Sequence, residues 1–80
     1  MRRRHVDVLW RFFYAMLMRD DEHKPSPPTR EQWVRINESQ RARVTRADLV
    51  HLEGTGLLVC VTGGSRRLTR AGLNAIGIRT

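Results

Sequence analysis

Apolar residues recur at helical spacing in the first stretch of the chain. Val6, Leu9, Phe13 and Leu17 lie three or four residues apart, which places their side chains on one face of a helix. The pattern predicts a helix that begins at Val6, after a flexible basic N-terminus formed by residues 1–5. This helix carries more large apolar side chains than one buried stripe requires. The surplus residues are Trp10, Phe12, Tyr14 and Met18.

The surplus apolar surface has two interpretations. In the first, loops of a small domain cover it. In the second, Trp10, Phe12, Tyr14 and Met18 form an interface for a second copy of the chain or for another protein. The pattern alone leaves both open.

A polar, proline-rich connector from residue 20 to residue 28 ends the first helix. Proline rings cannot continue a helix, and the residues before them are driven toward extended dihedrals. Thr29 and Gln32 then have the spacing of a capping box, in which each side chain bonds to the other residue's backbone N–H. A second, short helix is therefore expected from Thr29, with Trp33 and Ile36 facing the core.

A third helix is predicted from Gln40 to Glu53, with Ser39 as its N-cap. Its inward residues follow helical spacing, and Gly54 and Gly56 provide a stop because glycine adopts left-handed dihedrals without a steric penalty. The inward residues are Ala42, Thr45, Leu49 and Leu52.

Two short apolar or β-branched runs follow, from Leu57 to Thr62 and from Ser65 to Thr69. The Gly63-Gly64 pair between them predicts a two-residue β-hairpin turn. In that register Val59 is opposite Leu68, and Cys60 is opposite Arg67. The tail after Thr69 predicts a short C-terminal helix that packs back through Leu73 and Ile76. The expected fold is α+β: a single domain over residues 1–80, with three helices, a two-stranded hairpin and a short C-terminal helix.

The charge of the chain narrows the choice of partner. Its 80 residues include 15 basic and 8 acidic residues, a formal net charge of +7, and every basic residue except Lys24 is arginine. Arginine offers a planar fork of donors that fits phosphates and the guanine edge, so the bias favours an anionic polymer. Arginine-rich composition is also typical of proteins encoded by GC-rich genomes.

Several classes of protein are excluded or disfavoured by the residues. The single cysteine, Cys60, cannot form an internal disulfide, so a cytoplasmic location is expected. The apolar run near the N-terminus is interrupted by Asp7 and Arg11 and is too short to span a membrane. The histidines are scattered without metal-ligand spacing, and the chain has no paired carboxylates or triad elements. We therefore expect no metal, no cofactor, no enzymatic activity and no membrane partner.

The C-terminal half carries a recognisable series of residues. A helix ends in Leu52-Glu53, Gly56 with Leu57 and Leu58 opens the first strand, and the second strand runs through Leu68 into Thr69 and Gly72 as L-T-x-x-G. This order resembles the second half of MarR-type and PadR-type winged helix-turn-helix domains, over about half of the chain. The very short wing and the lack of a long C-terminal dimerisation helix favour a minimal winged-helix module over a ligand-sensing repressor.

The resemblance implies a small DNA-binding protein, a transcription regulator whose partner is double-stranded DNA. The third helix would enter the major groove with its N-terminal end at the bases, and the wing would contact phosphates. The candidate DNA-binding residues are Gln40, Arg41, Arg43, Val44, Arg46, Ala47, Arg66 and Arg67. The alternative is a winged-helix module or inhibitor that docks on a protein or nucleoprotein through the first helix.

Overall fold

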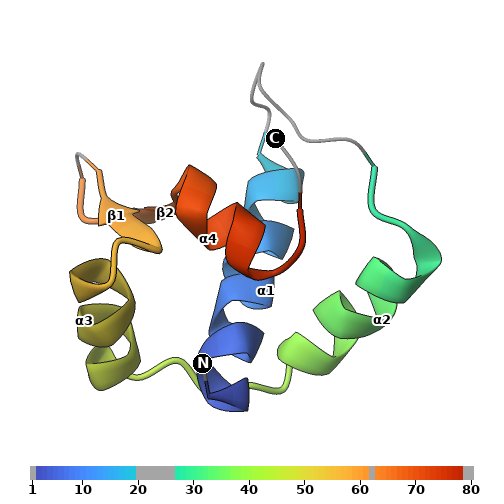
Figure 1. Ribbon diagram of the computed structural model, residues 1–80, viewed down its shortest axis with the longest axis horizontal. Coiled ribbons are helices and arrows are strands. Elements are labelled where there is room, and N and C mark those ends of the chain that lie inside the picture. The colour runs from blue at the N-terminus through green and yellow to red at the C-terminus, as the bar shows by residue number, and fades with distance from the viewer. Residues whose placement is uncertain (1, 20–26, 62, 79–80) are drawn as a thin grey trace.

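The computed structural model describes residues 2–19, 27–61 and 63–78. Within these residues, the elements follow one another as four helices and one two-stranded antiparallel hairpin, which confirms the predicted α+β order (Figure 1). Helix α1 runs through the centre, with α2 and α3 on either side of it. The bounds are α1 Arg3–Met18, α2 Arg30–Ser39, α3 Arg46–Gly54, β1 Leu58–Cys60, β2 Arg66–Leu68 and α4 Arg70–Ala75.

Helix α1 supplies the central part of the core and touches α2, α3, α4 and β2. Leu9 and Phe13 are completely buried, as their helical spacing predicts, and so is Val8, which the predicted stripe did not include. The helix begins at Arg3, three residues before the predicted Val6, so Arg3, Arg4 and His5, which were expected to belong to a flexible terminus, form its first turn. This start is supported by a contact with α3, because the Arg4 guanidinium donates a hydrogen bond to a buried carboxylate there.

Helix α2 begins as predicted. Thr29 accepts the backbone N–H of Gln32 at 3.2 Å, and the Gln32 side chain accepts the backbone N–H of Thr29 at 2.8 Å. Ile36 is completely buried, but Trp33, which was also expected to face the core, is 38% exposed. Its ring meets Tyr14 of α1 edge to face at 6.5 Å. The prediction for Trp33 is therefore wrong in part, because Tyr14 covers only one side of the indole.

Helix α3 begins at Arg46, six residues later than predicted. Ser39 does not cap it: this residue is the buried last residue of α2, and its hydroxyl donates to the Ile36 carbonyl at 2.6 Å. Thr45 is the N-cap instead. Its hydroxyl accepts the backbone N–H of Asp48, and the Asp48 carboxylate accepts the backbone N–H of Thr45. This capping box fixes the start of α3 and leaves residues 40–45 as a connection.

The hairpin pairs Leu58 with Leu68, Val59 with Arg67 and Cys60 with Arg66. This register differs by one residue from the predicted one. The pairing continues to Val61, whose N–H donates to the Ser65 carbonyl at 2.9 Å, so three residues and not two separate the paired positions. Gly63 and Gly64 both have positive φ in this turn. As a result Leu58, 2% exposed, faces the core, while Val59 is 46% exposed.

Helices α3 and α4 end in the same way. In both, a glycine with positive φ follows the last turn, and the next residue donates its N–H back to a buried leucine carbonyl at 2.9 Å. For α3 the residues are Gly56, Leu57 and Leu52, and for α4 they are Gly77, Ile78 and Leu73. This hydrogen-bond pattern is the Schellman motif, and it returns an apolar side chain toward the core after each helix.

Candidate nucleic-acid interface

The outer face of α3 consists of Arg46, Ala47, Val50 and His51. All four are exposed, and Val50 is 62% exposed in the middle of the helix. The sequence placed Arg46 and Ala47 on this face but missed Val50 and His51, because the predicted helix began six residues too early. An arginine at the N-terminal end followed by small apolar side chains can contact both guanine and a thymine methyl group.

Neither acidic residue of α3 contributes charge to this outer face. Asp48 is buried on the inner side, and the Glu53 carboxylate accepts a hydrogen bond from Arg66 of β2. Arg46 has no ion pair with any residue in the described ranges 2–19, 27–61 and 63–78. The outer face therefore presents a cation and an imidazole without a neighbouring carboxylate on the same helix face.

Four of the predicted DNA-binding residues lie in the connection before α3 and not on the helix. Gln40 is the C-cap residue of α2, and its amide donates to the Ile36 carbonyl at 3.3 Å. Val44 is half-buried and packs against the core. Gln40 therefore does not lie on the helix where the sequence placed it, and the predicted outward position of Val44 is wrong, because Thr45 and not Ser39 starts α3. Arg41 and Arg43 remain exposed and flank the start of α3.

The connection is held in place by α1. The Arg11 guanidinium of α1 donates a hydrogen bond to the carbonyl oxygen of Ala42. Arg43, Val44 and Thr45 line an open hollow of about 710 Å³ together with Arg4 and Asp7 of α1. The exposed arginines of the connection thus sit on a backbone that is tied to the central helix.

The two arginines of the hairpin differ in their surroundings. Arg66 is half-buried and paired with Glu53 of α3, so its charge is already balanced within the protein. Arg67 is exposed and lies opposite Val59 on the other face of the hairpin. Arg66 is better placed to fix the hairpin on α3 than to reach a phosphate. Sequence reasoning did not predict the ion pair between Arg66 and Glu53.

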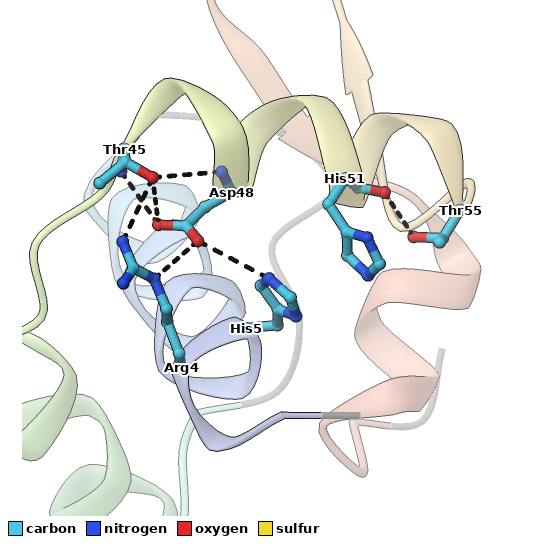
Figure 2. A network of polar contacts seen from close by, with 6 residues as sticks. All are labelled: Arg4, His5, Thr45, Asp48, His51 and Thr55. Carbon is cyan, nitrogen blue, oxygen red and sulfur yellow. Dashed lines mark hydrogen bonds and ion pairs between the residues drawn. The ribbon is translucent and has the colours of Figure 1, made fainter.

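A polar network joins the start of α3 to the first turn of α1 (Figure 2). Asp48 is at its centre. One carboxylate oxygen accepts the Arg4 Nε–H at 2.8 Å and lies 3.6 Å from His5 Nε2. The other accepts the backbone N–H and the hydroxyl of Thr45 at 3.0 and 2.8 Å. The hydrogen bond from Arg4 is the main reason that the pKa of Asp48 lies far below its ordinary range.

The rings of His5 and His51 stack beside this network. Their centroids are 4.3 Å apart and their planes differ by 15°. Partial burial is the main cause of a lowered pKa for His5; His51, Arg2 and Arg4 lower it further, while Asp48 opposes the shift. The T-x-x-D pattern of a capping box was the sequence signal for Asp48. No local signal marks the histidine pair, because its members come from different helices.

The network predicts a two-step loss of stability in acid. The folded pKa of His5 is below its ordinary 6.5, so the unfolded chain binds a proton more readily and stability falls as the pH drops through about 6.5. The Asp48 pKa is also depressed, so the stability it provides is full above its ordinary 3.8 and is lost below that. Thermal midpoints measured from about pH 8 to about pH 2 should show the upper step and the beginning of the lower one, which continues down to the depressed pKa of Asp48. His5→Gln should remove the upper step, and an unchanged profile would contradict the assignment.

The predicted apolar interface on α1 is only partly exposed. Trp10 is 5% exposed and meets Phe13 edge to face at 5.7 Å, so its prediction as an interface residue is wrong. Phe12 and Tyr14 are half-buried and pack against the core, and only Met18 is largely exposed. Elements of the domain itself that pack against α1 therefore cover most of the surplus apolar surface.

Other kinds of site are not apparent in the described part of the chain. No group of histidine, cysteine and acidic side chains within residues 2–19, 27–61 and 63–78 could hold a metal ion. Among these residues, no helix combines the length and the apolar character needed to cross a membrane. Comparison of the chain with protein-family models, curated proteins and solved structures finds no match.

Proposed function

We propose that the chain is a small cytoplasmic DNA-binding protein that regulates transcription. Helix α3 enters the major groove, with Arg46 at the base edges and Ala47 and Val50 against thymine methyl groups. Arg41 and Arg43 meet the phosphates beside α3, and Arg67 of the hairpin meets those farther along the duplex. No chemical step is part of this function.

The observation that supports the proposal is the charge pattern of α3. Both acidic residues of the helix are engaged inside the protein, Asp48 by Arg4 and Glu53 by Arg66. The outer face is left with Arg46, two small apolar residues and His51. A face of this composition can approach a polyanion without repulsion and can make apolar contact with bases.

The DNA-binding function is tested with Arg46→Ala. We expect the chain to bind a short random-sequence duplex at low salt, and the variant to bind about tenfold more weakly with a salt slope lower by about one unit. Fluorescence anisotropy across a salt series measures both quantities. Because Arg46 is exposed at the start of α3, its replacement should leave the fold intact, as circular dichroism can verify.

Arg35→Ala is the matched control. Arg35 is also exposed, but it belongs to α2, on the other side of α1 from α3. Its removal changes the net charge by the same amount and should change affinity little. Absence of binding at low salt, or equal effects of the two variants, would overturn the proposal.

A second candidate function is a protein-binding module that uses α2 and the end of α1. Trp33, Val34 and Met18 are exposed to different degrees despite their apolar character. Under this alternative Val34→Asp would abolish association with a protein partner or with a second copy, seen as a change in sedimentation. The DNA-binding proposal predicts no effect of this variant on duplex affinity.

A further inference from the structure

An open hollow of about 880 Å³ lies between the first turn of α1 and the side of α3 that carries Thr45, Asp48 and His51. It borders the proposed DNA-binding face, because Ala47 and His51 belong both to that face and to the wall of the hollow. The other wall comes from α1. This wall is formed by Arg4 and His5 of α1 and by its N-cap residue Arg2.

The lining is cationic although it includes a carboxylate. Both oxygens of Asp48 are engaged by Arg4 and Thr45, so this acid is matched by one arginine. Arg2 is exposed and forms no ion pair with a residue of the described ranges. One positive charge therefore remains when both imidazoles are neutral, and a proton taken up by His5 adds another.

The imidazole pair gives the hollow a variable number of donors. A neutral imidazole donates one hydrogen bond, whereas the protonated ring donates two and carries a charge. In the free protein the surroundings oppose protonation of His5, since partial burial and the charges of His51, Arg2 and Arg4 outweigh the attraction of Asp48. An anion in the hollow reverses this balance, because it stabilises the charged ring.

We propose that this hollow binds a phosphate group of the DNA backbone and that the His5–His51 pair takes up a proton when it does so. The inference rests on the proposed function, because a duplex held against α3 brings its phosphates to the edge where Ala47 and His51 lie. Arg2 supplies a permanent charge to the phosphate, and His5, stacked on His51, supplies charge that depends on pH. The consequence is a duplex affinity that rises as the pH falls.

The test is duplex affinity against pH at constant salt. A phosphodiester keeps its charge in this range, so a change in affinity reports on the protein. From about pH 7.5 to about pH 5.5 we expect the wild-type chain to bind about five- to tenfold more tightly. His51→Gln keeps a hydrogen-bonding side chain without a titrating ring and should remove most of this change. Arg2→Ala should weaken binding at every pH.

His23→Gln is the matched control, since it removes an imidazole that lies outside the described residues. It should leave the pH dependence as in the wild type, and circular dichroism should show that each variant is folded at both ends of the range. A wild-type pH dependence that persists in His51→Gln and in the double variant His5→Gln/His51→Gln overturns the inference. If Arg46→Ala still weakens duplex binding in that case, the proposed DNA-binding function stands and only the phosphate site in the hollow is rejected. Absence of duplex binding at every pH overturns both the proposed DNA-binding function and the phosphate site.

Discussion

Gly72→Ala is expected to destabilise the fold by about 2–4 kcal/mol, a large part of the total of about 4–12 kcal/mol typical for a domain of this length. Gly72 is buried in α4, which lies against the start of β1. A Cβ atom at this position would come within 2.2 Å of the Leu57 carbonyl oxygen and within 3.2 Å of a Leu68 methyl carbon. The oxygen belongs to the backbone and cannot rotate away. Either α4 must move off the hairpin or the hairpin must bend.

Gly54→Ala is the matched control for this prediction. Gly54 is also helical, but a Cβ there would meet no atom within 4 Å. Alanine at this site should stabilise the protein by about 0.4–1 kcal/mol, because it reduces the freedom of the unfolded chain without a clash. Urea unfolding of both variants should show midpoints that move in opposite directions. A Gly72→Ala midpoint equal to that of the wild type would contradict the close approach of α4 to Leu57.

Asp48→Ala should have the second largest effect, a decrease of about 5–10 °C in the thermal midpoint. The substitution removes the acceptor for the backbone N–H of Thr45 and the partner of Arg4. Helix α3 then loses its capping box and its polar link to α1 in one step. The acid transition assigned to Asp48 should disappear as well, which differential scanning calorimetry at several pH values would show.

Asp7→Ala serves as the comparison for Asp48→Ala. Asp7 is an acidic residue of α1 that is half-buried, and it forms no ion pair with residues of the described ranges. Its replacement changes the net charge equally but should leave the thermal midpoint nearly unchanged. Similar losses in both variants would mean that net charge and not the capping box determines the effect.

Local sequence signals predicted the fold well where a helix start had only one candidate N-cap. The Thr29–Gln32 capping box and the buried Ile36 were predicted because both depend on neighbours within one helical turn. The start of α3 was wrong because Ser39 and Thr45 are both favourable N-caps. In the structure Thr45 is the N-cap, and Asp48 completes its capping box. The Ser39 hydroxyl instead donates to a backbone carbonyl of α2. Greater weight on the T-x-x-D pattern would have given the correct bounds.

The hairpin register failed for a different reason. Each strand has only three residues, so the alternation of apolar and polar positions is too short to fix the pairing. A Gly-Gly pair is compatible with a two-residue turn and with a three-residue connection. Burial of Leu58 opposite Leu68 decides between them, and that depends on α1 and α4 beneath the hairpin.

The polar network at the proposed site was beyond the reach of sequence patterns. Arg4 and Asp48 are separated by 44 positions, and nothing in either segment identifies the other. The interface prediction for Trp10 failed in a similar way, because helical spacing shows which side chains are adjacent but not what covers them. The exposed face of α3 became visible only when the true start of the helix was known.

The pair of Arg66 and Glu53 joins the hairpin to α3 at a second point beyond the turn at Leu57. The angle between α3 and the hairpin is therefore fixed before any partner binds. Binding then costs less conformational entropy than it would if the hairpin were mobile. About one third of each side chain is open to solvent, so dissolved ions weaken the pair. Ionic strength is thus expected to act on the rigidity of α3 and the hairpin as well as on the proposed binding to DNA.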